Sequence, residues 1–330
     1  MTDVTVFGAG AMGTALAIHL ARVGEQVKLW GSRFDERVLP GLQNDRVHPA
    51  LTERLPESIR VLGPNELEEA AGGAEMAIMA ANSNGARSLG SIVAPALTQV
   101  RSLVSIAKGL EPGTVSRISE VYREELGERP TVVIGGPALA PEVADGLPAA
   151  AVFASTHAEA LEEAATTFQT DTYIVETTTD VPGVELCGTA KNVAAIGSGI
   201  LEGLGRAREI EYKNARAALF ARAVHEMADF VEGCGGRRET AFGLAGMGDL
   251  LVTSIGGRNR AFGEAVGMGG DPVRTLGNMT ERGLTVEGVE SARDVRVLAE
   301  KAGLVLPVHD AVYRIVHDGE PPTSILEALR

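Results

Sequence analysis

The first thirteen residues constrain the fold of this chain more than any other stretch. Residues 4–7 are apolar and β-branched, which favours a buried strand, and residues 14–22 are rich in strong helix formers. Between them lies Gly8-Ala9-Gly10-Ala11-Met12-Gly13. A strand, a Gly-x-Gly-x-x-Gly turn and a helix in this order predict a dinucleotide-binding site, and the alternative is a glycine turn in some other α/β fold.

Each glycine of this turn has a separate physical task. Gly8 allows the tight turn, and Gly10 lets the backbone approach a pyrophosphate because it has no Cβ. Gly13 lets the helix pack closely on the strand. The free N–H groups and the positive end of the helix then face the phosphates.

Residues 26–30 predict a second strand, and the residues at its end bear on which nicotinamide cofactor binds. Folds that prefer NAD place Asp or Glu about 20 residues past the glycines, where it binds the ribose 2′-hydroxyl. This chain has Gly31-Ser32-Arg33 there. A guanidinium without a carboxylate suits a 2′-phosphate, so the sequence favours NADP(H) over NAD(H) unless Arg33 is only a solvated loop residue.

The chain changes character near residue 180. Before it, apolar runs alternate with helical segments, which predicts an α/β fold with a doubly wound, mostly parallel sheet. The expected strands continue at residues 59–62, 75–81, 102–107, 131–134, 149–154 and 172–176, and the expected helices cover 66–71, 86–97 and 157–168. After it, helical segments dominate, at residues 182–204, 212–233, 240–251, 260–267, 285–301, 310–316 and 323–329. We therefore expect a Rossmann-type dinucleotide-binding domain over residues 1–180 and a mainly α-helical substrate-binding domain over 181–330.

Charge and composition exclude several classes of function. The formal net charge is −14, which opposes general attraction to nucleic acid or anionic membranes. No apolar run approaches the roughly 20 residues that a membrane helix needs. Cys187 and Cys234 form no C-x-x-C pair, and the six histidines show no metal-ligand spacing. The sequence predicts a cytoplasmic protein without a metal, without nucleic-acid partners and without membrane insertion.

Lys191 is the most informative residue after the glycines. It lies within the apolar run 188–196, and desolvation there lowers the pKa of an amine towards the range useful for proton transfer. The alternative is a lysine that extends its ammonium to water. Asn192 beside it could orient a substrate or be a helix-surface amide. Asp249, in the glycine-lined stretch 246–253, could pair with Lys191 or bind a substrate hydroxyl.

Two further basic positions predict binding of an anion. Lys108 follows the expected strand 102–107, where it contacts substrate or cofactor unless it is an ordinary exposed loop lysine. Arg258 and Asn259 lie at an expected helix N-terminus, which is a natural anion site unless it is a solvated helix start. Because arginine binds phosphate through a planar fork, a phosphorylated substrate is expected.

Taken together, the motifs resemble those of the NAD(P)-dependent sn-glycerol-3-phosphate dehydrogenases of bacteria and archaea. They occur in the family's order over nearly the whole chain, at residues 8–16, 107–110, 136–137, 190–193, 246–250, 258–260 and 286–288. The resemblance implies reversible reduction of dihydroxyacetone phosphate to glycerol 3-phosphate by hydride transfer from nicotinamide C4. It also implies a homodimer.

The resemblance assigns roles residue by residue. It makes Lys191 the general acid and base, while Asp249 and Asn192 are catalytic candidates on the residue reasoning given above. The substrate-binding residues are Lys108, Gly136, Lys191, Asp249, Arg258 and Asn259. The cofactor-binding residues are Gly8, Gly10, Ala11, Met12, Gly13, Arg33, Lys108, Ala140, Arg258 and Glu287.

The chain departs from the family pattern at several of these motifs. Ala138-Leu139 stand where Ser or Thr and then Phe are common, Pro141 replaces a basic residue, and Gly257 replaces a Ser. Each lost hydrogen bond to a charged group would cost roughly 1.5–3 kcal/mol. A different phosphorylated ketone or polyol therefore stays open, as does a 2- or 3-hydroxy acid. A non-enzymatic NADP-binding sensor is the further alternative.

Overall fold

The computed structural model describes residues 2–330, which form two compact units. The first unit runs to Glu111 and resumes over Ser116–Val181. The second consists of Pro112–Val115 and Pro182–Arg330. Among the described residues, no helix has the length and apolar character needed to cross a bilayer.

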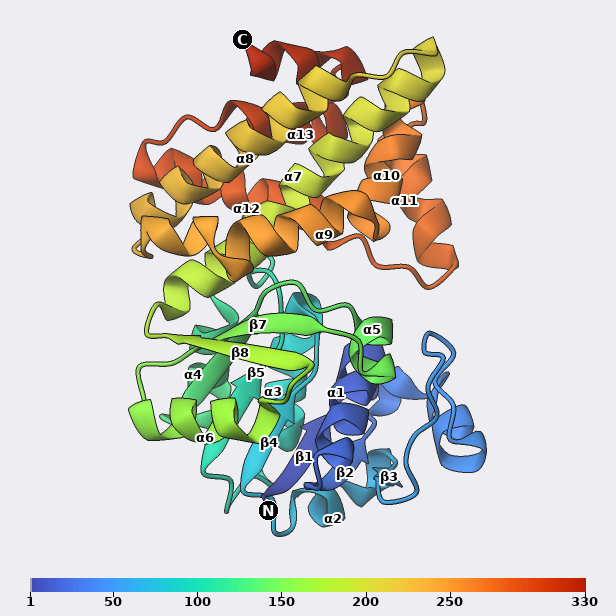
Figure 1. Cartoon of the computed structure of the whole chain (residues 1–330), viewed down its shortest axis with the longest axis vertical. Coiled ribbons are helices and arrows are strands. Elements are labelled where there is room, and N and C mark those ends of the chain that lie inside the picture. Colours follow the sequence, from blue (N-terminus) through green and yellow to red (C-terminus); the bar gives the residue numbers. More distant parts are fainter. Residues whose placement is uncertain (1) are drawn as a thin grey trace. The chain divides into compact units, whose positions relative to one another are not determined.

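An eight-stranded sheet forms the centre of the first unit (Figure 1). Its spatial order is β3-β2-β1-β4-β5-β6-β7-β8, and every neighbouring pair is parallel except β6 and β7. The strands are β1 (Asp3–Phe7), β2 (Gln26–Trp30), β3 (Arg60–Leu62), β4 (Met76–Met79), β5 (Ser102–Ser105), β6 (Thr131–Gly135), β7 (Ala149–Ala154) and β8 (Tyr173–Thr178). The strand order reverses direction at β1, and the carboxyl ends of strands at such a point form the usual ligand site of an open α/β sheet.

Helices pack on both faces of this sheet, which makes it doubly wound as predicted. They are α1 (Ala11–Arg22), α2 (Leu67–Ala71), α3 (Ala86–Val93), α4 (Ile118–Leu126), α5 (Ala140–Asp145) and α6 (Ala158–Phe168). Successive residues of a strand point to opposite faces. Accordingly, Val6 packs in one hydrophobic core with Leu16 of α1, while Phe7 packs in a second core with Tyr122 of α4.

The chain between β2 and β3 contains two short helical turns. They are η1 (Arg33–Asp35) and η2 (Gly41–Asp45), and further turns η3 (Pro64–Glu66) and η4 (Ser83–Gly85) precede α2 and α3. Helix α4 was not predicted, although its core-facing residues Ile118, Val121 and Tyr122 recur at helical spacing. Burial of that face in the second core stabilises the helix.

The second unit is mainly helical, as predicted (Figure 1). Its 28-residue helix α7 (Val181–Arg208) is buried along most of its length, as expected of a helix that is apolar on all sides. The other elements are α8 (Lys213–Gly233), η5 (Arg238–Phe242), η6 (Leu244–Gly248), α9 (Asp249–Ile255), α10 (Arg258–Gly267), α11 (Pro272–Glu281), α12 (Glu287–Ala302), α13 (Pro307–His317) and η7 (Pro322–Leu329). Helix α11 was not predicted; none of its residues is buried, and the Asp271 side chain caps it by accepting from Arg274 N.

Two pairs of glycines bring the backbones of α7 and α10 into direct contact. A Cβ added at Gly199, Gly203 or Gly263 would lie 2.1 Å from a backbone oxygen of the opposite helix, and one at Gly267 would lie 2.2 Å away. No side chain fits at such distances, so the close crossing depends on glycine at all four positions. The crossing holds Asn259, near the start of α10, against α7.

Candidate active site

The glycine turn of the first unit has the geometry of a phosphate-binding loop. A Cβ at Gly8, where φ is +116°, would lie 2.6 Å from the Ala80 carbonyl oxygen, and one at Gly13 would lie 2.3 Å from the Gly8 oxygen. Gly10 differs, because its Cβ would meet nothing within 4 Å. The open space therefore lies in front of Gly10. The first turn of α1 also has no acidic residue and no side-chain cap, so its N–H groups suit an incoming anion.

In the loop after β2, Arg33 is exposed, whereas the carboxylate of Asp35 is bound by Ser32. The Asp35 carboxylate accepts hydrogen bonds from Ser32 N at 2.8 Å and Ser32 Oγ at 2.9 Å, which closes a capping box on η1. The Arg33 guanidinium lies over the Phe34 ring, with Cζ 5.0 Å from the ring centroid. Phe34 is 66% exposed, so this edge of the unit presents a cation on an exposed aromatic surface.

Lys108 lies beyond the carboxyl end of β5 and is half-buried. Its ammonium donates to the Gly136 carbonyl oxygen at 3.0 Å, immediately after β6. Gly136 has a φ of +110°, and its added Cβ would lie 3.1 Å from Ala151, so glycine is required there. The structure thus brings together two residues that the sequence assigned to substrate binding.

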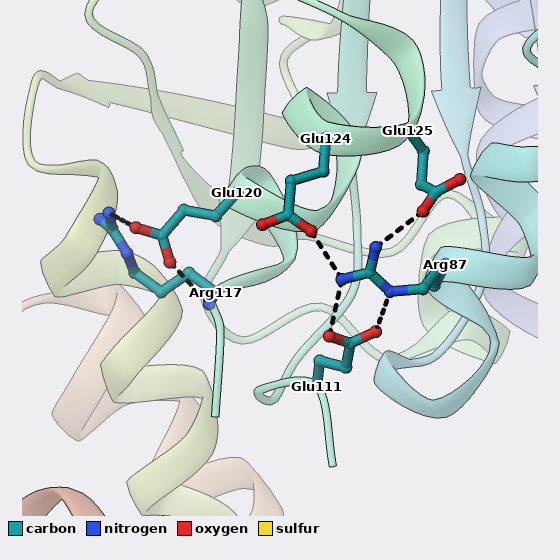
Figure 2. Close-up of polar contacts among 6 residues, drawn as sticks. All are labelled: Arg87, Glu111, Arg117, Glu120, Glu124 and Glu125. Carbon is teal, nitrogen blue, oxygen red and sulfur yellow. Dashed lines mark hydrogen bonds and ion pairs between the residues drawn. The ribbon is translucent and has the colours of Figure 1, made fainter. Parts of the chain in front are cut away.

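An arginine at the centre of three carboxylates anchors the chain just after Lys108 (Figure 2). Arg87 of α3 donates to both oxygens of Glu111, at 2.5 and 2.9 Å, and to Glu124 and Glu125 of α4 at 2.8 and 2.7 Å. These hydrogen bonds raise the pKa of the Arg87 guanidinium above its usual range. Since Glu111 is three positions from Lys108, the cluster restrains the loop that carries this lysine.

In the second unit, Lys191 and Asp249 form a buried ion pair. The distance from Lys191 Nζ to Asp249 Oδ1 is 2.6 Å, and the two residues are 4% and 2% exposed. The carboxylate stabilises the ammonium form of the lysine. Thr253 Oγ1 accepts from Lys191 Nζ at 3.2 Å and donates to the Asp249 backbone oxygen at 2.6 Å. The pairing of Lys191 with Asp249, which the sequence offered as one of two possibilities for Asp249, is therefore confirmed.

The turns before α9 and α10 place the polar residues of this site. Asp249 begins α9 directly after η6, in which Gly246 packs so tightly that an added Cβ would lie 2.1 Å from the Ala241 oxygen. Gly257 precedes α10 with φ 97° and ψ 169°, a conformation essentially confined to glycine. At position 257, where the family commonly has serine, this chain thus has glycine in a backbone conformation that serine would adopt only under strain.

A second polar cluster joins three helices of the same unit. Asn259 Nδ2 on α10 donates to Asn192 Oδ1 on α7 at 2.9 Å, and the backbone N–H of Gly288 on α12 donates to Asn259 Oδ1 at 3.0 Å. Arg258 is exposed and Glu287 is half-buried; each directly precedes a member of the cluster. The structure therefore gathers Asn192 and Asn259 and places Arg258 and Glu287 at the edge of the same cluster.

Some residues of these clusters escaped the sequence reasoning. Thr253 lies four positions after Asp249 on one helix, a spacing that places both on the same face and could have signalled it. Gly288 gave no signal of its own, because its contribution is a backbone N–H. Ala140 begins α5, and Pro141 follows it in the first turn, where a missing N–H costs nothing.

Comparison with known proteins agrees with this arrangement. A family model described as the NAD-dependent glycerol-3-phosphate dehydrogenase N-terminus matches residues 3–161, and one described as its C-terminus matches residues 180–327. The chain belongs to the NAD-dependent glycerol-3-phosphate dehydrogenase family. The resemblance carried by the sequence motifs is thereby confirmed.

Relatives of this glycerol-3-phosphate dehydrogenase family member match it over almost its whole length. An NADP(+)-dependent glycerol-3-phosphate dehydrogenase from Archaeoglobus fulgidus is 35% identical, over 98% of this chain and 97% of the relative. A glycerol-3-phosphate dehydrogenase [NAD(P)+] from Symbiobacterium thermophilum is 37% identical, over 99% and 93%. The crystal structure of glycerol-3-phosphate dehydrogenase from Coxiella burnetii is 33% identical, with a TM-score of 0.89 over 99% of this chain and 98% of that one.

Proposed function

We propose that this family member catalyses the reversible NAD(P)H-dependent reduction of dihydroxyacetone phosphate to sn-glycerol 3-phosphate. The names of its relatives supply the reaction. The single observation that carries the proposal is the buried Lys191 ammonium, 2.6 Å from Asp249. Ketone reduction consumes one hydride and one proton, and a buried ammonium is a suitable proton donor.

The first unit is proposed to bind the dinucleotide. The open space before Gly10 and the uncapped start of α1 fit its pyrophosphate at the N–H groups of Ala11 and Met12. When bound, the nicotinamide supplies the hydride that adds to the ketone carbon. Lys108, in the loop beyond β5, and Ala140, at the start of α5 beyond β6, are proposed as further contacts.

Lys191 is proposed as the general acid. As the hydride adds to the carbonyl carbon, negative charge develops on the ketone oxygen, and Lys191 Nζ transfers a proton to it. Asp249 holds the ammonium in place before the transfer, and Thr253 Oγ1 accepts a second hydrogen bond from Nζ. In the reverse direction the neutral amine takes the proton from the alcohol.

We infer that the phosphate of the substrate is bound by Arg258. Arg258 is exposed at the start of α10, where the helix N-terminus adds to its attraction for an anion. Because Ala138 and Gly257 lack the hydroxyls common in the family, the identity of the phosphorylated ketone is part of the proposal.

A preference for NADP(H) is the second part of the proposal. Arg33 is exposed at the end of β2, while Asp35 is engaged by Ser32. A guanidinium at this place suits a 2′-phosphate, whereas a free carboxylate would suit a 2′-hydroxyl. The relative from Archaeoglobus fulgidus carries the name of an NADP(+)-dependent enzyme.

The proposal is tested by assaying dihydroxyacetone phosphate, other phosphorylated ketones and hydroxy acids with NADPH and NADH side by side. We expect turnover of dihydroxyacetone phosphate with a higher kcat/KM for NADPH. Turnover of hydroxy acids alone would contradict the substrate class, and no hydride transfer with any compound would favour a sensor.

Lys191→Met should lower kcat about 100-fold or more, because the proton donor is lost, and should leave the Kd of NADPH unchanged. Lys191→Met/Asp249→Asn provides a second variant without an unpaired buried carboxylate. Measured kcat close to that of the wild type in both variants would exclude Lys191 as the acid.

A further inference from the structure

Glu226 and His309 are buried ionisable residues that the proposed proton transfer does not use. Glu226 of α8 is 7% exposed, and His309 of α13 is 2% exposed. The carboxyl group of Glu226 accepts hydrogen bonds from the backbone N–H groups of Val308 and His309, at 2.8 and 3.1 Å. Leu306, which precedes α13, provides no side-chain cap, so Glu226 satisfies N–H groups that the first turn of a helix leaves unpaired. Glu226 thus joins the start of α13 to α8.

The imidazole of His309 extends from this helix start to α7. Its Nδ1 lies 2.8 Å from Glu226 Oε2, and its Nε2 lies 3.2 Å from the carbonyl oxygen of Ala190. A carbonyl oxygen can only accept, so Nε2 carries a hydrogen and donates it to Ala190. This holds whichever of Nδ1 and Oε2 carries the proton between them. The ring therefore presents a fixed hydrogen-bond donor to α7.

The carbonyl that accepts this hydrogen bond belongs to the peptide group that joins Ala190 to Lys191. The bond therefore restrains the backbone from which the Lys191 side chain extends. The other end of that side chain is held by α9, where Lys191 Nζ lies 2.6 Å from Asp249 Oδ1 and donates to Thr253 Oγ1 at 3.2 Å. The backbone of Lys191 and its ammonium are thus fixed by two different helices.

Helix α13 also packs directly on α7 beyond this hydrogen bond. A Cβ added at Gly197 would lie 3.0 Å from Cγ2 of the buried Val312, which is three positions after His309 on the same face of α13. Apolar contacts are non-directional, whereas a hydrogen bond favours one rotation and one axial position of the helix. Buried ionisable pairs add little net stability, and fixing the geometry of packed elements is their best-attested use.

We propose that His309 is a positioning residue, which holds the peptide group between Ala190 and Lys191 so that the Lys191 ammonium meets the ketone oxygen of the substrate. Glu226 orients the imidazole and fixes the start of α13. The inference rests on the proposed function, which makes Lys191 the proton donor. A displacement of about 1 Å in such a group can lower the rate about 100-fold, although no contact with the substrate is removed.

Three substitutions of His309 separate its two side-chain hydrogen bonds. His309→Gln places an amide nitrogen near the position of Nε2, so it keeps the donor to Ala190. His309→Asn places one near the position of Nδ1, so it keeps only the contact with Glu226. His309→Met has about the size of glutamine and no donor. We expect the single-turnover rate of hydride transfer to dihydroxyacetone phosphate to stay within about threefold of the wild type in His309→Gln and to fall about tenfold or more in the other two, with the Kd of NADPH unchanged.

This order of effects separates positioning from packing. If His309 only filled space, His309→Gln and His309→Met would behave alike, because the two side chains have similar volumes. His19→Asn is the control for lost stability, since it removes a hydrogen bond from another buried imidazole Nε2, 2.8 Å from the Phe168 oxygen in the first unit. It should lower the thermal midpoint and leave the rate of hydride transfer unchanged. Equal rates in His309→Gln and His309→Met would overturn the proposal.

Hydrogen exchange of α7 tests the same role without turnover. In His309→Met, the amides of residues 188–194 should exchange about fivefold faster than in His309→Gln, because the hydrogen bond to Ala190 is lost, while those of α10 should exchange at the same rate in both. Equal exchange of residues 188–194 in the two variants would contradict the positioning role. If the wild type transfers hydride to no ketone but exchange follows this order, the proposed function fails and the positioning stands.

Discussion

Two buried acids of the second unit have opposite surroundings. Asp249 lies beside the ammonium of Lys191. Asp294 of α12 is 6% exposed, and burial together with the negative charge of Glu290 raises its pKa to about 7. The first carboxylate therefore has a cationic partner. The second retains a proton under conditions where an exposed aspartate loses it.

This difference predicts how stability depends on pH. Between pH 3.8 and about 7, Asp294 ionises in the unfolded chain but stays protonated in the folded one, so the wild type loses stability as pH rises through this window. Asp294→Asn should therefore be more stable than the wild type at pH 8, by an amount on the order of 4 kcal/mol, with the difference vanishing near pH 4.

Thermal unfolding of both proteins from pH 4 to pH 8 measures this effect. The exposed Asp318→Asn serves as the control for loss of one carboxylate. A stability difference for Asp294→Asn that stays constant over this range would show that ionisation of Asp294 is not responsible.

At the scale of elements, the segment after Lys108 is held in place at both of its ends. Leu110 and Arg117 form an antiparallel bridge, Glu111 is bound by Arg87, and Arg117 pairs with Glu120 at 2.6 Å (Figure 2). Between these two ends, Val115 has a φ of +56°, which is strained for a β-branched residue. A strained turn persists only where its surroundings determine it.

Loss of the central cation should weaken this arrangement. Arg87→Ala leaves the carboxylates of Glu111, Glu124 and Glu125 near one another without the guanidinium that joins them. We expect a lower thermal midpoint than in Arg123→Ala, where an exposed α4 arginine lies 3.9 Å from a single glutamate. High salt should narrow the difference, since it screens both the attraction and the repulsion. Equal midpoints for the two variants would show that the cluster does not contribute to stability.

At the scale of the whole molecule, the residues proposed for the cofactor's pyrophosphate and for proton transfer belong to different compact units. Gly10 lies in the first unit, and Lys191 and Asp249 lie in the second. Binding of NADPH and transfer of a proton should therefore respond to different substitutions. Thermal stability with and without NADPH measures the binding of NADPH, because a ligand that binds only the folded state stabilises that state.

Gly10→Val should separate the two properties. Its Cβ meets nothing within 4 Å, so we expect the thermal midpoint without NADPH to match that of the wild type. NADPH at about 100 times its Kd should stabilise the wild type and Lys191→Met by about 2.7 kcal/mol. The same concentration should have little effect on Gly10→Val, because the added side chain occupies the space before the turn. Full stabilisation of Gly10→Val would contradict the proposed site.

The amino-acid sequence by itself predicted the features that depend on local pattern. The turn 8–13, the alternation of strands and helices up to residue 180 and the change to helices beyond it follow from glycine spacing and apolar periodicity. The same reasoning missed α4 and α11, although Ile118, Val121 and Tyr122 have helical spacing and Asp271-Pro272 is a helix-start signal.

Only the tertiary structure decided which polar groups meet. The sequence offered Asp249 as a partner of Lys191 but not Thr253, and it contained no sign that Gly288 would donate to Asn259 and Asn259 to Asn192. These contacts join residues 62 and more positions apart, or use a backbone N–H that every residue but proline possesses. Close helix crossings bring them together, at distances that periodicity along the chain does not encode.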